Sequence, residues 1–371
     1  MSVRWVSEEK GMLAGKVVLV RSGLNVPITD GVVSNDFRIR KALPTLQFLH
    51  DEGARVVIIA HIGREPHETL RPVASELRKY LPITFSTRSD LNINAMENGD
   101  IVLLENLRQD VREAVNDATF AAELTKGVDI FVQDAFAVCH REHTSIVGIP
   151  TYVPSFGGLL LRDEIEALTL ALDPEHPALC ILGGAKFSTK EPLIKSFLST
   201  YDTVFVGGAL QNEILAARGL AVGTSVIEDG KVSAAILSNN ALHTIEDVVV
   251  AQPDGIVRTL SVSDVPDNGS IVDIGEKTIQ ALADEVSTYK TILWNGPLGW
   301  YERGFTAATI ALAHAVANTG ARTILGGGDT IAVVQKEGLE ERFDFVSTGG
   351  GAMLEFLLNK TLPGIEALKR N

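Results

Sequence analysis

The stretch TILGGGDT at residues 323–330 joins an apolar, β-branched run to a glycine stop, and the C-terminal half repeats this pattern. The other runs are CILGGAK (180–186), TVFVGGAL (203–210), TILWNGPLG (291–299) and FDFVSTGGGA (343–352). Such a run predicts a buried strand, and glycine after it lets the backbone turn sharply and approach a ligand. Amide groups in these loops and at the following helix starts bind anions. The five runs therefore predict one edge of a sheet built around phosphate groups.

The N-terminal half alternates strand-like with helix-like segments. We expect strands at 16–21, 55–61, 100–108 and 128–135, and helices at 40–53, 73–81 and 117–127. This rhythm is typical of a parallel sheet covered by helices on both faces. Residues 151–158 have the composition of a loop, and 159–172 that of a linking helix. In the second half we expect helices at 191–199, 211–218, 230–244, 275–288, 306–318 and 329–337, and a helix with a tail over 351–371.

Length and composition limit the class of protein. The 371 residues suggest roughly two domains, and a content of 45% hydrophobic and 22% charged residues is typical of a soluble globular protein. The net charge of −14 argues against a nucleic-acid partner. Two cysteines are too few for a disulfide framework and favour a reducing cytoplasm. No apolar stretch approaches the ~18 residues of a membrane span, and MSVRWVSEEKG is too charged for a signal peptide.

Cationic residues mark the ends of the strands expected in the N-terminal half. They are Arg21, His61, Arg64 and Arg108, with Arg141 in the loop after the fourth strand and Arg38 just before a helix. Ligands of doubly wound folds lie beyond the carboxyl ends of the strands, so we expect these side chains to converge on one edge of the sheet. Arginine binds phosphate and carboxylate through paired hydrogen bonds. The cluster therefore predicts a small ligand that carries several negative charges.

The common phosphate-binding motifs are absent from the sequence. There is no P-loop, no protein-kinase motif pair, and no G-x-G-x-x-G after the first strand. Cys139, His140 and His143 lack a second ligand group at matching spacing, which argues against a metal centre there. The glycine-rich edge offers instead Lys186, Lys190, Asn295, Glu302, Asp329 and Thr330. An acid after a glycine-rich loop suits Mg²⁺, and lysines neutralise transferring phosphoryl oxygens.

These residues resemble the phosphoglycerate kinase family over nearly the whole chain. The matching motifs are LNVP (24–27), RIRKALPT (38–45), AHIGR (60–64), LLENLR (103–108), DAFAVCHREHTS (134–145), LGGAK (182–186), WNGPLGWYE (294–302), GGGDT (326–330) and STGGGA (347–352). The resemblance implies an α/β fold of two Rossmann-like three-layer αβα domains with parallel sheets, joined by a helix, with a cleft between them. It implies a phosphoglycerate-binding domain at 1–155, a linking helix at 156–175, a nucleotide-binding domain at 176–350 and a segment at 351–371 that returns to the first domain.

The same resemblance implies an activity and a set of site residues. The activity is reversible, Mg²⁺-dependent phosphoryl transfer between 1,3-bisphosphoglycerate and ADP in glycolysis, by direct in-line transfer with domain closure. Phosphoglycerate would contact Gly23, Leu24, Asn25, Arg38, His61, Ile62, Gly63, Arg64, Arg108 and Arg141. ATP or ADP would contact Gly184, Lys190, Asn295, Glu302, Gly327, Gly328, Asp329 and Thr330, with Asp329 on the metal. The catalytic set would be Arg38, Lys186, Gly350 and Gly351. A cytoplasmic monomer with no nucleic-acid or membrane partner is also implied.

The chain departs from the family pattern at several positions. Gly23 stands where the family has an aspartate that bonds the substrate hydroxyl. Losing that bond costs roughly 1.5–3 kcal/mol, or about ten- to a hundredfold in affinity. Asp163 replaces a frequent lysine, the residues from Gly208 to Asn212 leave the nucleotide preference open, and the loop after Arg108 is short. Two alternatives therefore remain: a nucleotide-binding protein without turnover, and a kinase for a different small phosphorylated carboxylic acid.

Overall fold

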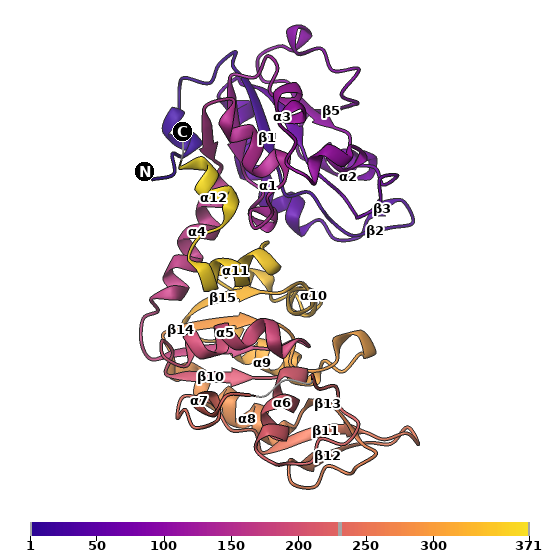
Figure 1. Ribbon diagram of the computed structural model, residues 1–371, viewed down its shortest axis with the longest axis vertical. Coiled ribbons are helices and arrows are strands. Elements are labelled where there is room, and N and C mark those ends of the chain that lie inside the picture. The colour runs from indigo at the N-terminus through magenta and orange to yellow at the C-terminus, as the bar shows by residue number, and fades with distance from the viewer. Residues whose placement is uncertain (1, 229–231, 370–371) are drawn as a thin grey trace. The chain divides into compact units, whose positions relative to one another are not determined.

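The computed structural model describes residues 2–228 and 232–369, and Figure 1 draws them as a ribbon. The chain forms two compact units. The first contains the residues up to 166 and those from 359 onward, and the second contains residues 167–358. Each unit is built on a parallel sheet, which confirms the predicted α/β class. Within the described residues, no helix has both the length and the apolar character needed to cross a membrane.

The sheet of the first unit has six parallel strands. Their order is β5 (Ile83–Ser86), β6 (Ile101–Leu104), β4 (Arg55–Ile59), β1 (Val17–Arg21), β7 (Ile130–Gln133) and β8 (Ser155–Gly157). Successive side chains of a strand point to opposite faces, so Val18 and Val20 belong to one core cluster and Val17 and Leu19 to another.

Helices cover both faces of this sheet. On one face lie α1 (Phe37–Asp51) and α2 (Arg71–Leu77), and on the other lies α3 (Ala118–Leu124). A small hairpin, β2 (Ile28–Thr29) and β3 (Val32–Val33), follows the first strand. At the C-terminus, α12 (Pro363–Leu368) packs against β8, and the Gly364 N–H donates to the Cys139 carbonyl at 2.9 Å. The expected tail therefore contains a second short helix.

Three details of the first unit differ from the sequence predictions. The strand expected at 100–108 ends at Leu104, because the chain turns into a 3-10 turn, η3 (Leu107–Gln109), where Asn106 caps the Arg108 amide. The loop expected at 151–158 contains the edge strand β8, and β5 was not predicted. Strands of three and four residues carry little pattern of their own, and pairing with β7 and β6 decides them.

The sheet of the second unit consists of the five glycine-ended runs. Its parallel strands are ordered β10 (Thr203–Val206), β9 (Ala178–Leu182), β14 (Thr291–Asn295), β15 (Arg322–Gly326) and β16 (Phe345–Val346). The helices of this unit are α5 (Phe187–Phe197), α6 (Ala209–Ala217), α7 (Ala234–Leu237), α8 (Glu276–Glu285), α9 (Ala307–Ala317), α10 (Gly328–Lys336) and α11 (Gly351–Asn359). The helix α4 (Leu159–Leu172) runs across the boundary between the units, at the place predicted for a linking helix.

An antiparallel sheet in the second unit was not predicted. It contains β12 (Val257–Ser261), β11 (Asp247–Ala251) and β13 (Ser270–Ile274), with β11 in the centre. The helix expected at 230–244 is wrong. Its first two positions lie outside the described residues, and the remainder contains only the four-residue α7. The rest of that segment is a loop, in which Leu242 forms an isolated parallel β-bridge with Val204 of β10.

Candidate functional site

The cationic site of the first unit is built on a buried arginine at the end of β1. Arg21 is 1% exposed. Its Nε donates to Ser145 Oγ at 2.9 Å, and its Nη1 donates to the Ser22 carbonyl at 2.6 Å. The Ser145 hydroxyl in turn donates to Glu113 Oε1 at 2.5 Å. Burial lowers the pKa of Arg21 to about 10, and the Glu113 carboxylate opposes that shift. The guanidinium is therefore charged at neutral pH and fixed in place.

His61 is held in one tautomer by this arginine. The Nη2 of Arg21 lies 2.8 Å from Nδ1 of His61. A guanidinium only donates, so Nδ1 accepts and Nε2 carries the proton. Burial, together with Arg21 and Arg108, keeps the pKa of His61 well below its ordinary value. The site thus presents a neutral imidazole N–H, which suits an anionic oxygen without adding a charge.

Two loops place the other cations of this site. At the start of α1, Arg38 is half-buried and its Nη1 donates to the Asn25 carbonyl at 2.7 Å. Asn25 Oδ1 accepts from the Gly63 N–H at 3.0 Å, which ties the LNVP and AHIGR motifs together. Burial lowers the pKa of Arg38, while the nearby Glu164 raises it. The Arg108 guanidinium donates to the Gly63 carbonyl.

The remaining predicted residues of the first unit occupy different environments. Leu24 and Ile62 are buried and take part in the core, so their backbone rather than their side chains faces the loop region. Arg64 and Arg141 are exposed. Burial lowers the pKa of Arg108, and the positive charge of Arg141 lowers it further. The structure thus brings Arg38, His61 and Arg108 into contact with shared loops, with Arg64 and Arg141 at the surface beside them.

Four residues of this site were missed as site residues by sequence reasoning. Arg21 was noted as a strand-end cation but not assigned, and Glu113, Ser145 and Asn106 were not considered. Asn106 accepts from the amides of Ile62 and Arg108, at 3.2 and 3.1 Å. Its Nδ2 also donates to the Ile62 carbonyl at 3.0 Å. The available signal was their place in the quoted motifs, since Asn106 lies in LLENLR and Ser145 ends DAFAVCHREHTS.

In the second unit, the glycine loops pack backbone against backbone at the carboxyl ends of the strands. A side chain on Gly183 would collide with the carbonyl oxygen of Pro297 in the neighbouring loop. Gly208 has a φ of +63° and would bring a Cβ to 2.8 Å from the Gly184 amide nitrogen. Glycine is required here because β9, β10 and β14 end side by side and their loops leave no room for a Cβ. The close approach seen here is between neighbouring loops, and the predicted approach of these glycines to a ligand stays a prediction.

The two lysines of this edge differ in their surroundings. Lys190 is half-buried on α5, donates to the Gly183 carbonyl and lies 3.5 Å from Asn295 Oδ1. Burial lowers its pKa to about 8. Lys186 is exposed at the N-cap of α5. The Ser188 amide, which donates to the Glu228 carboxylate, lowers the pKa of Glu228, and the Lys186 charge adds to this effect. Asn295 is fixed from the other side, because its Nδ2 lies 3.4 Å from the Met353 sulfur.

A cavity of about 220 Å³ lies beside these loops in the second unit. Its lining includes Gly184, Leu298, Trp300, Glu302 and Asp329. Partial burial raises the pKa of the Asp329 carboxyl, and the Glu302 carboxylate raises it further. Two carboxylates that repel each other beside a glycine-rich helix start fit a divalent cation with hard oxygen ligands.

The donor set limits how a metal would bind. Across residues 2–228 and 232–369, no three His, Cys, Asp or Glu side chains gather as a metal cluster. Mg²⁺ commonly takes one or two carboxylates and completes its shell with water and phosphate oxygens. The residues present therefore fit Mg²⁺ that arrives with a nucleotide.

Backbone amides complete the glycine-rich edge. Gly327 has a φ of +91° and precedes α10, whose first turn contains Gly328, Asp329 and the buried Thr330. Gly350 has a φ of +52° and precedes α11, which begins at Gly351. A Cβ at Gly328, Gly350 or Gly351 would meet nothing within 4 Å, so these amides border open space. Amides at two helix starts are suited to bind phosphate oxygens.

Comparison with known proteins gives a consistent result. A model of the phosphoglycerate kinase family matches residues 9–360. The phosphoglycerate kinase of Herpetosiphon aurantiacus is 41% identical over 380 residues, which cover 96% of each chain. That of Borrelia garinii is 38% identical over the full length of both chains. Among solved structures, phosphoglycerate kinase from Coxiella burnetii has a TM-score of 0.85 at 37% identity and covers 99% of each chain. The enzyme from Pyrococcus horikoshii has a TM-score of 0.85 at 29% identity.

Proposed function

This chain belongs to the phosphoglycerate kinase family, and we propose that its two units divide the reaction between a phosphoglycerate site and a nucleotide site. The enzyme is a glycolytic phosphotransferase that exchanges a phosphoryl group between 1,3-bisphosphoglycerate and ADP, giving 3-phosphoglycerate and ATP. This assignment of one substrate to each unit is supported by two candidate anion sites of different construction in one chain. One is an arginine cluster around His61, and the other is a glycine-rich sheet edge with Lys190.

The first unit is proposed to hold phosphoglycerate. Arg38, Arg108 and the Nε2–H of His61 offer donors around loops that hydrogen bonds to Asn25 and Asn106 keep in place. The exposed Arg64 and Arg141 add positive charge for the distal phosphate. A ligand with a phosphate and a carboxyl group meets cations at both ends. Gly23 removes one hydrogen-bond acceptor for the substrate hydroxyl.

The second unit is proposed to hold the nucleotide. The apolar cavity lined by Leu298 and Trp300 receives the base and ribose, with Glu302 at its edge. Lys190, Asn295 and the amides of Gly327 and Gly328 face the phosphates. Asp329 is the residue that would hold Mg²⁺, which when bound neutralises charge on the phosphate oxygens.

Phosphoryl transfer asks the protein for positioning and positive charge more than for covalent chemistry. We assign stabilisation of the transferring group to Lys186, Arg38 and the amides of Gly350 and Gly351. A carboxylate is the nucleophile in one direction and the leaving group in the other, so no strong general base is required. Transfer is direct and in line, and closure of the two units excludes water from the reaction. Since each chain holds both sites, we infer a cytoplasmic monomer.

The first test is formation of 1,3-bisphosphoglycerate from 3-phosphoglycerate and Mg-ATP, followed with a coupled dehydrogenase. Lys186→Ala is expected to lower kcat by about 10²–10³-fold, because one preorganised charge at the transferring group is lost. Lys195→Ala is the matched control, because Lys195 is on the same helix and makes only a surface pair with Glu191. Turnover of Lys186→Ala equal to that of the control would overturn the assignment of Lys186. Absence of turnover in the wild-type protein would favour a non-catalytic or substrate-shifted protein.

A further inference from the structure

A second cavity lies in the first unit, and Asn106 of the proposed phosphoglycerate site borders it. It has a volume of about 510 Å³, within the range of small-molecule sites. Its floor is one face of the sheet, where Leu19 of β1, Val57 of β4 and Leu104 of β6 present buried side chains. Leu91 and Val128 are only partly buried and extend the apolar surface.

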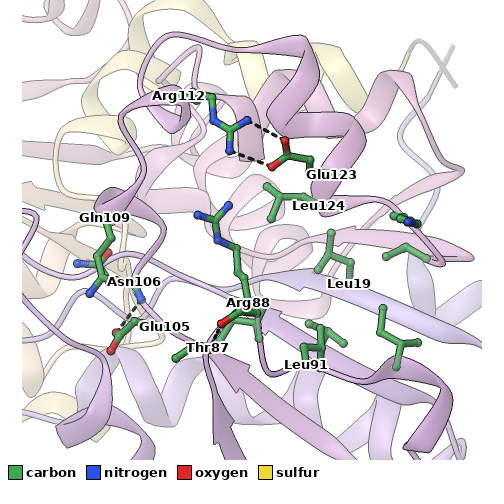
Figure 2. A pocket seen from close by; sticks show the side chains of 16 residues that line it. Leu19, Thr87, Arg88, Leu91, Glu105, Asn106, Gln109, Arg112, Glu123 and Leu124 are labelled. Carbon is green, nitrogen blue, oxygen red and sulfur yellow. Dashed lines mark hydrogen bonds and ion pairs between the residues drawn. The ribbon is translucent and has the colours of Figure 1, made fainter.

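The two sides of the cavity differ in character. In Figure 2, Leu19, Leu91 and Leu124 lie on one side, Glu105, Asn106 and Gln109 lie on the other, and the long Arg88 side chain stands between them. Arg88 comes from the loop after β5, and its Nη2 donates to Asp110 at 2.9 Å. Its guanidinium also stacks 4.7 Å from the centre of the Phe120 ring. The arginine is thereby held in position before any ligand binds.

Most charged groups of the lining are already paired. Arg112 is bonded to Asp110 and to Glu123, each at 2.9 Å. The Glu105 carboxylate accepts from the Leu70 amide at 2.9 Å and from the Asn106 amide at 2.7 Å. These groups have little left to offer a ligand.

The charged groups of the lining with unused capacity are cationic. Within the described residues, Arg88 Nε and Nη1 and the Lys126 ammonium have no hydrogen-bond partner. Lys126 is exposed at the rim of the cavity. An apolar floor with uncommitted cations in the lining fits a ligand with an apolar body and one anionic group.

We propose that this cavity binds a small amphipathic organic anion, whose carboxylate, sulfonate or phosphate group meets Arg88 and Lys126 and whose apolar body lies on Leu19, Val57 and Leu104. Of the residues placed above in the phosphoglycerate and nucleotide sites, Asn106, which holds the loops of the first site, also borders this cavity. The groups proposed to contact the anion and its apolar body differ from those assigned to either substrate, so occupancy of the cavity does not depend on the proposed catalytic function.

The test uses 8-anilinonaphthalene-1-sulfonate as the probe, with Mg-ADP and 3-phosphoglycerate in excess. Fluorescence titration of the wild-type protein is expected to show one saturable site. The Arg88→Ala, Lys126→Ala double variant is expected to bind at least tenfold more weakly, since charge-assisted hydrogen bonds of this kind each contribute a substantial part of the affinity. Lys10→Ala, which removes an exposed cation outside the cavity, is the control and should bind as the wild type does.

Methyl NMR locates the probe independently of affinity. The methyl signals of Leu19, Val57 and Leu104 are expected to shift through the ring currents of the naphthalene, while those of Leu298 and Ile271 in the nucleotide cavity stay unchanged. Equal affinity of the double variant and Lys10→Ala would overturn the proposal. So would saturable binding that shifts only the methyl signals of the second unit, or a wild-type protein that binds no probe.

Discussion

Restoring an aspartate at position 23 tests the phosphoglycerate site directly. Gly23 follows β1, and a Cβ built there would lie 3.7 Å from Ala135 Cα and 4.0 Å from Ala135 Cβ, which are ordinary van der Waals contacts. Its φ lies outside the left-handed region that favours glycine. A Cβ therefore fits at this position without a change of backbone. Arg21 lies two residues earlier in the chain and contacts His61, so a carboxylate at position 23 follows directly on the cationic cluster.

The expected gain follows from one hydrogen bond. A carboxylate that accepts from the substrate hydroxyl contributes about 1.5–3 kcal/mol, so Gly23→Asp should tighten 3-phosphoglycerate binding by about ten- to a hundredfold. Gly23→Asn offers a neutral acceptor of similar shape, worth about 0.5–1.5 kcal/mol. That corresponds to about two- to tenfold in affinity. Gly23→Ala adds a Cβ and no acceptor, and should leave affinity near that of the wild type.

The assay measures KM and kcat for 3-phosphoglycerate at saturating Mg-ATP, and Kd by calorimetry. The expected order of affinity is Asp, then Asn, then Ala and wild type together. Urea unfolding of each variant reports whether the fold is retained. If Gly23→Asp is folded but binds 3-phosphoglycerate no better than Gly23→Ala, the hydroxyl of the substrate does not face position 23, and the proposed orientation is wrong.

Three further predictions address charges and buried hydrogen bonds. Lys190 has a pKa of about 8 in the free protein, and nucleotide phosphates should raise this pKa, so ADP binding at pH 8 should take up about half a proton. Calorimetry in buffers of different ionisation enthalpy measures the proton uptake. Equal proton uptake by Lys190→Met would contradict the prediction. Burial raises the pKa of Asp134 to about 7, so the protonated carboxyl stabilises the folded state at low pH, and this stabilisation is lost as pH rises from about 4 to 7. The free energy of unfolding of Asp134→Asn relative to wild type should therefore rise by up to roughly 1.4 kcal/mol per pH unit in that window. A difference in urea unfolding that does not change with pH would refute this prediction. Ser145→Ala should lower the free energy of unfolding by about 1–3 kcal/mol, because the buried Glu113 and Arg21 both lose a partner; Ser145→Thr keeps the hydroxyl and serves as control, and a loss below about 0.5 kcal/mol would contradict the role of this network.

The glycine-ended runs show how far local sequence reaches. Each of the five lies in one parallel sheet of the second unit, as predicted. Apolar, β-branched runs are buried wherever they pair, and glycine after them is required by the crowding of neighbouring loops. The strand-end position of Arg21, His61 and Arg108 follows from the same reasoning, because parallel strands bring their carboxyl ends to one edge.

Long-range contacts decided the rest. Sequence places Arg21 and His61 at strand ends but does not show that one fixes the tautomer of the other. Ser145 lies 124 residues from Arg21 and 32 from Glu113, and neither spacing has a local signature. The edge strand β8 and the antiparallel sheet around β11 likewise depend on partners that are distant in the chain.

The sequence by itself determined the five glycine-ended strands, their glycine turns and the residue types proposed to meet phosphate, because burial and backbone freedom act within a few neighbouring residues. Tertiary structure alone decided which cations are buried and which ring nitrogen of His61 carries the proton. It also decided that the pKa of Lys190 is lowered while Lys186 is exposed, and that a cavity lies on one face of the first sheet. These properties depend on desolvation and on the direction of hydrogen bonds, which exist only after distant segments have packed together.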